Sequence, residues 1–157
     1  MDGQATGEGQ SALGRSLQKP LRMSHPVGQQ PDWHPKNFMI ELQDKIRILS
    51  NPITVAELQA IAKERFGDMV KAVVDLDKKV MAIGGELHAD EEAVLLDNGS
   101  QQRNLWGINI YVDQPRENWL EFDSMINIRP SQNNRSRTVE NVTLQKKIID
   151  VVNGLIK

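Results

Sequence analysis

The sequence contains no cysteine among its 157 residues, and this absence excludes a disulfide framework, a thiol nucleophile and a thiolate metal site. Aromatic residues make up only 4% of the chain, too few for a convincing base-stacking platform on single-stranded nucleic acid. The formal net charge is −2, whereas proteins that grip duplex nucleic acid usually have a marked basic excess. A local basic patch therefore remains the route by which this chain could hold an anionic partner.

Long apolar runs are also missing. No stretch approaches the length that crosses a bilayer, and the N-terminus lacks the apolar core of a signal peptide. We therefore expect a cytoplasmic protein without a membrane partner. Glycine-rich phosphate loops, nucleophile elbows and zincin motifs are absent, so the sequence contains no complete catalytic motif.

The chain divides by composition near Met39. Glycine, glutamine, serine, proline and histidine dominate residues 1–38, which show no helical or strand period. Such composition predicts a disordered N-terminal tail, and Met39 is a candidate translation start. Residues 39–157 carry regular apolar patterning, and a segment of about 120 residues is long enough to bury one core. We therefore expect a single domain over residues 39–157.

Apolar periodicity predicts the elements of this domain. Residues 46–49 indicate a short strand or an arm leading into the first helix. That helix starts at Thr54 with Glu57 in a capping box and ends at Gly67. Alternation predicts a hairpin over residues 69–83 and strands over 106–112 and 119–129. Residues 90–97 favour a short helix, with a strand over 93–96 as the alternative, and residues 139–156 favour the last helix.

Hairpins rather than crossovers imply a mainly antiparallel sheet, and helices should cover its apolar face. The expected fold class is therefore α+β, with two layers and the helices packed on one face of the sheet. The apolar stripes predict these core residues: Leu58, Ile61, Phe66, Val74, Ile108, Ile110, Phe122, Ile126, Ile148 and Val152.

An acidic segment with the predicted domain's single histidine is the first candidate site. Glu86, His88 and Asp90 are spaced by two, so in an extended chain all three side chains point the same way. An imidazole between carboxylates can bind a divalent metal or act as a tuned base. The alternative is a solvent-facing loop whose acids cap the next helix, and it is favoured because a complete spacing such as His-Glu-x-x-His is missing.

A basic, amide-rich segment is the second candidate site, and it follows a polar stripe on the predicted strand over residues 119–129. The stripe consists of Asp123, Asn127 and Arg129, and its alternative is the solvated face of a half-exposed sheet. The loop carries Arg129, Asn133, Asn134, Arg135 and Arg137. Arginine forks pair with phosphate or carboxylate. The alternative for the loop is a flexible segment whose charges keep the domain soluble.

Three segments resemble a prokaryotic family of unknown function. They run from Gly84 to Glu92, from Leu105 to Asn109 and from Phe122 to Pro130. The resemblance covers roughly residues 54–156. It implies no activity for this chain, and it implies a domain that begins near Met39.

Two functional hypotheses follow. The first is a binding or regulatory module that holds an anionic ligand or partner through the Arg/Asn-rich loop: a nucleotide, an RNA backbone or an acidic protein surface. The second is a small hydrolytic or metal-dependent enzyme, in which His88 acts with Glu86 and Asp90. The enzyme requires His88 and the arginine loop to converge on one pocket, whereas the binding module does not.

Overall fold

The structure, a computed structural model, describes residues 45–157. The predicted tail and Met39 lie outside these residues. The described residues form one five-stranded sheet in the order β1-β3-β2-β4-β5, with every neighbouring pair antiparallel. The α+β class and the antiparallel hairpins are therefore confirmed. In chain order the strands and α-helices are β1 (Arg47–Leu49), α2 (Val55–Arg65), β2 (Met69–Asp75), β3 (Val80–Ile83), α3 (His88–Asp97), β4 (Leu105–Tyr111), β5 (Leu120–Glu121) and α4 (Val142–Leu155).

Helix α2 begins and ends as its sequence predicts. Thr54 Oγ1 accepts from the Glu57 amide at 3.1 Å, and Glu57 Oε1 accepts from the Thr54 amide at 3.3 Å. Gly67 follows the helix with a φ of +93°, a conformation that glycine adopts without steric cost. Phe66, which we expected in the core, is instead 41% exposed. It is the C-cap residue of α2, so the helical period no longer turns its ring toward the sheet.

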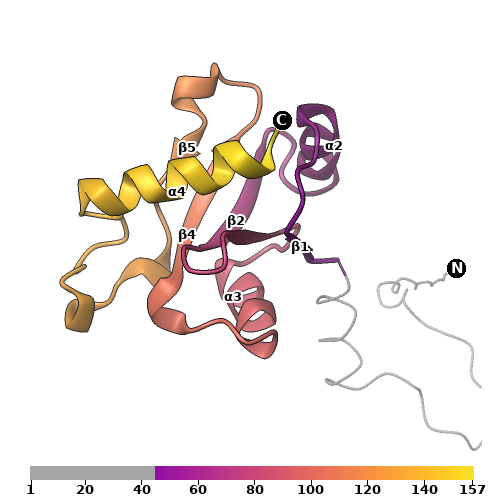
Figure 1. Cartoon of the computed structure of the whole chain (residues 1–157). Coiled ribbons are helices and arrows are strands. Elements are labelled where there is room, and N and C mark those ends of the chain that lie inside the picture. The colour runs from indigo at the N-terminus through magenta and orange to yellow at the C-terminus, as the bar shows by residue number, and fades with distance from the viewer. Residues whose placement is uncertain (1–44) are drawn as a thin grey trace, which may run out of the picture. The chain divides into compact units, whose positions relative to one another are not determined.

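Helices α2 and α4 cover one face of the sheet, and α3 lies on the other (Figure 1). The main core takes alternate residues of β2 and β4, such as Val74 and Ile108, together with Leu58 of α2 and Ile148 of α4. A helix of this kind buries an apolar stripe whose period matches 3.6 residues. This face is the apolar layer that the alternation predicts.

The position of α3 adds a second, partial layer that the two-layer expectation did not include. Its Leu95 packs with Val73 and Ala82 on the opposite face of the sheet. The sequence signal for this layer is the continuous apolar run from Ala72 to Val74. Strands buried on both faces read as continuous apolar runs rather than as alternation. Beyond α3, the side chains of β4 and β5 on this second face include the polar residues Asn109 and Glu121.

The predicted strand over residues 119–129 is wrong beyond its start. Only Leu120 and Glu121 pair with β4, and residues Met125–Asn127 form a 3₁₀ turn. The buried Asn127 side chain takes over the role of the missing strand, because its Oδ1 accepts from the Gly107 amide at 2.8 Å and its Nδ2 donates to the Gly107 carbonyl at 3.0 Å. Asp123, Asn127 and Arg129 therefore do not form one stripe on one face.

Gly107 allows this arrangement. A Cβ atom at Gly107 would lie 2.6 Å from both Cβ and Oγ of Ser124, closer than non-bonded atoms approach. The chain after β5 therefore packs directly on the backbone of β4. Trp119 is buried in the main core, and its indole donates to the Gln114 carbonyl at 2.8 Å.

Most of the expected core is confirmed. Leu58, Val74, Ile108, Ile110, Ile148 and Val152 are buried in the main core, and Ile61 and Phe122 are partly buried against it. Ile126 instead packs against the cluster beneath α3. Among the helices of residues 45–157, none has the length and apolar character that crossing a membrane requires.

Candidate functional site

A hollow of about 490 Å³ opens on the second face of the sheet, beside the start of α3. Four separate parts of the chain line it: β2, the start of α3, β4, and the segment from Glu121 to Arg137. The hollow therefore brings together His88 from the acidic segment and Arg137 from the basic segment. Most of the charged and hydrogen-bonding side chains that line it are Lys71, His88, Asn109, Tyr111, Glu121, Asp123 and Arg137.

The floor of the hollow is a row of three side chains across three strands. Lys71 of β2 is the register partner of Asn109 of β4, and Asn109 is the register partner of Glu121 of β5. Residues directly opposite one another on neighbouring strands present their side chains on the same face. The row therefore runs from a cation, through an amide, to a carboxylate.

Asn109 has an acceptor without a partner. Its Nδ2 donates to Glu121 Oε1 at 2.8 Å and to the Asp123 carbonyl at 3.3 Å. Both partners are acceptors, which fixes the orientation of the amide. The Oδ1 atom is buried and has no hydrogen-bond partner among the described residues. Native structures contain few such atoms, and a ligand or bound water is one explanation for each.

His88 is held in one tautomer. Its Nε2 atom lies 2.8 Å from the Ile108 carbonyl, which only accepts, so Nε2 carries the proton. Burial lowers the pKa of His88 to about 4; the Ile108 carbonyl and Asp123 raise it, whereas Lys71 and Arg137 lower it further. The imidazole is therefore neutral at pH 7.

The cations of the hollow differ in whether a carboxylate pairs with them. Arg137 Nε lies 2.7 Å from Asp123 Oδ1, and these two side chains are 55% and 41% exposed. An exposed pair of this kind contributes little to stability and leaves both groups accessible to a ligand. Within the described part of the chain, Lys71 forms no ion pair, and its ammonium lies 5.5 Å from the centre of the Phe66 ring. Lys71 is thus the cation of the hollow that is not neutralised by a neighbouring carboxylate.

The proposed metal ligands do not converge. Glu86 is exposed and precedes α3, while His88 and Asp90 lie two positions apart within the helix. Two positions along an α-helix correspond to about 200° of rotation, so the two side chains point in different directions. Residues 45–157 contain no group of three or more histidine or acidic side chains placed to hold a metal ion.

Arg129 lies away from the hollow, and its donors are occupied. Its guanidinium donates to the Ile126 carbonyl at 3.0 Å, to the Gln102 carbonyl at 2.7 Å and to the Leu105 carbonyl. The same group lies 4.5 Å from the centre of the Trp106 ring. A guanidinium with these contacts fastens the loop onto β4 and has little capacity left for a ligand.

The other polar residues of the loop also differ in whether they are buried and hydrogen-bonded or exposed. Buried Asn134 donates to the carbonyls of Asn127 and Thr138, each at 2.7 Å, and accepts from the Glu140 amide at 2.9 Å. Asn133 and Arg135 are exposed and do not line the hollow. Of the predicted ligand-binding residues, the structure therefore brings only Asp123 and Arg137 together with His88.

Sequence reasoning missed Lys71, Asn109 and Glu121. The only sequence signal for Lys71 and Asn109 was that each is a polar residue between apolar neighbours in a strand. Only the pairing register reveals that these side chains form one row.

Comparison with known protein families identifies the family of this chain. A family described as "Protein of unknown function (DUF5674)" matches residues 47–155. The chain belongs to the DUF5674 family. This confirms the resemblance to a family of unknown function. Comparisons with curated proteins and with solved structures found no match.

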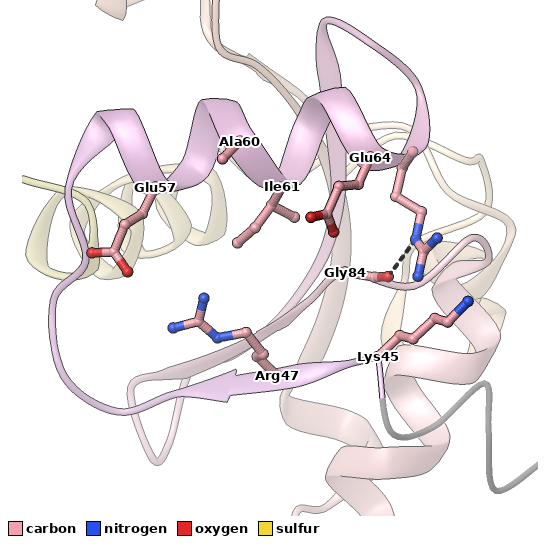
Figure 2. A pocket seen from close by; sticks show the side chains of 8 residues that line it. Lys45, Arg47, Glu57, Ala60, Ile61, Glu64 and Gly84 are labelled. Carbon is pink, nitrogen blue, oxygen red and sulfur yellow. Dashed lines mark hydrogen bonds between the residues drawn. The ribbon is translucent and has the colours of Figure 1, made fainter.

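A second hollow of the DUF5674 domain, of about 460 Å³, lies between α2 and β1 (Figure 2). Glu57 and Glu64 of α2 line one side, Arg47 of β1 lines the other, and Arg65 donates to the Gly84 carbonyl at 2.9 Å. These carboxylates and Arg47 are exposed. Their polar groups are therefore open to solvent, and these side chains of the hollow do not need a ligand.

Glu91 is the other buried titratable group of α3 in the DUF5674 domain. Its Oε2 accepts from the Gly85 amide at 2.9 Å, and its Oε1 has no partner among residues 45–157. Burial raises the pKa of Glu91 well above its ordinary value of 4.5, although the Gly85 amide and Lys71 lower it. Glu91 and His88 therefore change the stability of the domain in opposite directions as pH rises.

We expect the variants His88→Gln and Glu91→Gln to separate these two effects. The pKa of His88 falls from 6.5 to about 4 on folding, so the unfolded chain binds the proton first, and stability decreases by up to about 3 kcal/mol as pH falls through that window. The pKa of Glu91 rises on folding, so its contribution is complete below pH 4.5 and is lost as pH rises.

Urea denaturation between pH 4 and pH 7.5 checks this expectation. Glu91→Gln should become more stable as pH rises from 4 to 6.5, because the opposing contribution of Glu91 is removed and that of His88 remains. His88→Gln should become less stable as pH rises above 4.5. Parallel stability curves for the two variants would contradict these assignments.

Proposed function

We propose that the DUF5674 domain is a binding module and that its site is the hollow lined by Lys71, His88, Asn109 and Arg137. The ligand is a small molecule or chain end that carries an anionic group. One observation carries the proposal: four separate segments converge on a hollow whose lining includes a cation without an ion pair and a buried amide oxygen without a hydrogen-bond partner, as far as residues 45–157 are concerned. A fold that leaves such groups unsatisfied loses stability, and a ligand restores it.

The charges of the hollow favour a single anionic group over a polyanion. Lys71 has no ion pair within the described residues, and Arg137 shares its charge with Asp123. Glu121 and Asp123 line the same hollow and would repel a run of phosphates. The site therefore suits one carboxylate or phosphate group better than an RNA backbone or a broad acidic protein surface.

The hydrolytic alternative depends on His88 as a base. A general base works best when its pKa lies near the working pH, and the pKa of His88 is lowered to about 4. At pH 7 only about one in a thousand molecules of a group with that pKa is protonated. Its Nε2 proton is held by the Ile108 carbonyl, so Nδ1 is the nitrogen that would have to accept a proton. The lowered pKa supports a neutral wall of a binding site and does not favour catalysis.

Calorimetric titration of the full chain with sodium acetate at pH 7 tests the proposal. We expect one site with an affinity of about millimolar, because so small an ion has few contacts to make. Lys71→Met removes the unpaired cation and should weaken acetate binding about fivefold, since a hydrogen bond to a charged group contributes more than a neutral one. Lys146→Met removes an exposed cation from α4 and should leave the affinity within about twofold.

Two results would overturn the proposed function. One is the absence of any saturable acetate binding to the full chain, and the other is an equal loss of affinity in the two lysine variants. Equal losses would mean that acetate responds to net charge and not to the hollow.

A further inference from the structure

We infer that the ligand of this hollow is an apolar residue with a free α-carboxylate beside an N–H donor, the chemistry shared by a peptide C-terminus and a free amino acid. The inference rests on the proposed function and specifies the ligand of the same site. Three features of the hollow support it: the order of charges along its floor, the free acceptor of Asn109, and two exposed apolar side chains at its margin.

The order of charges along the row determines the orientation of a bound ligand. Lys71 lies at one end of the row, Asn109 in the middle and Glu121 at the other end. Neighbouring strands are about 4.8 Å apart. A carboxylate is therefore attracted to the Lys71 end and repelled at the Glu121 end, while a donor is attracted to the middle and to the Glu121 end.

Asn109 supplies the acceptor for that donor. Its Nδ2 is committed to Glu121 and to the Asp123 carbonyl, so Oδ1 is the amide atom left for a ligand. Oδ1 is covered by its neighbours, and a ligand reaches it when one of them turns aside. Lys71 and Met125 line the same hollow, and both are long side chains with several rotatable bonds.

Apolar side chains at the margin supply the third feature. Leu87 of the turn before α3 is 58% exposed, and Met125 of the 3₁₀ turn is 64% exposed, and both line the hollow. Because both line the same hollow, they give a ligand an apolar surface beside the polar floor. A ligand side chain that packs against them removes apolar surface from water while its carboxylate and N–H group face the floor.

His88 adds no charge to the hollow, and this affects which ligands the hollow favours. It is neutral at pH 7, so it neither attracts a second anionic group nor repels an ammonium group. A phosphate monoester carries more negative charge than a carboxylate and offers no N–H donor to Asn109. Capture of a chain end by its carboxylate is an established mode of peptide recognition.

Titration of the full chain with matched small probes tests the inference. N-acetyl-L-leucine carries the carboxylate, the N–H donor and an apolar side chain, and we expect it to bind at least about tenfold more tightly than acetate. N-acetyl-L-leucinamide lacks the carboxylate and N-acetylglycine lacks the side chain, so each should bind about fivefold more weakly than N-acetyl-L-leucine. Free L-leucine distinguishes the two sources: tighter binding than N-acetyl-L-leucine indicates an amino acid, and weaker binding indicates a peptide end.

A variant pair checks the margin of the hollow. Met125→Ala should weaken N-acetyl-L-leucine about fivefold, whereas Val142→Ala, which shortens a side chain that is 62% exposed on α4, should leave it within about twofold. If acetate and N-acetyl-L-leucine bind equally, the inference is overturned and the proposed function stands. If neither probe binds, both are overturned.

Discussion

Arg129→Ala is expected to destabilise the domain by about 3–5 kcal/mol, the range typical of removing one partner from a buried charged network. The Arg129 side chain is 8% exposed and donates to main-chain carbonyls of Gln102, Leu105 and Ile126. Its removal leaves these acceptors without their donor and uncovers the Trp106 ring, over which the guanidinium lies.

The matched control is Arg135→Ala in the same loop. Arg135 is exposed, so its truncation should change the free energy of unfolding by no more than about 0.5 kcal/mol. Urea denaturation of both variants measures the difference. Similar stabilities for the two variants would show that Arg129 does not fasten the loop to β4.

Asn127→Ala is expected to cost about 3 kcal/mol. The Asn127 amide is fully buried and satisfies both the N–H and the carbonyl of Gly107, and it also donates to the Arg137 carbonyl at 3.0 Å. Each buried main-chain group that loses its partner costs about 1–3 kcal/mol. The variant should therefore loosen the chain between β5 and α4 at its central attachment.

Asn133→Gly is the control for this change. Asn133 is exposed and has a φ of +62°, a conformation that glycine adopts readily, so the variant should be close to neutral. Thermal denaturation monitored by circular dichroism compares the two. A melting temperature for Asn127→Ala within error of Asn133→Gly would contradict the role assigned to the Asn127 amide.

The parts of the fold that depend on local chemistry could be predicted from the sequence. The Thr54 and Glu57 capping box, the turn at Gly67 and the hairpin of β2 and β3 each follow from neighbouring residues. The apolar alternation of β4 likewise identifies the face that it buries. These features require no knowledge of which distant segment packs against them.

The segment after β5 shows where such reasoning stops. Alternation from Trp119 to Arg129 is typical of a strand, yet the chain leaves the sheet after Glu121 and attaches to Gly107 through a side chain. A side-chain amide that replaces a strand's hydrogen bonds gives no periodic signal. The same limit hid the structural roles of Arg129 and Asn134, because buried and exposed polar residues look alike in a sequence.

The candidate site was predictable in part. His88 and Arg137 came from the two unusual segments, and their convergence on one hollow could be posed as a question but not answered. Lys71 and Asn109 gave no motif, since their importance comes from the register that places them opposite each other. The basic loop accordingly has two functions in the structure: Arg129 and Asn134 hold it in place, and Arg137 reaches the hollow.

The most direct test of the central claim is an amide-resolved NMR titration of the full chain with sodium acetate. If the hollow is the ligand site, the largest shift changes will occur at Lys71, Ala89 and Asn109 and will saturate together. If instead they occur at Asn133, Arg135 and Ser136, with those three unchanged, then the exposed loop is the anion site and the hollow is not.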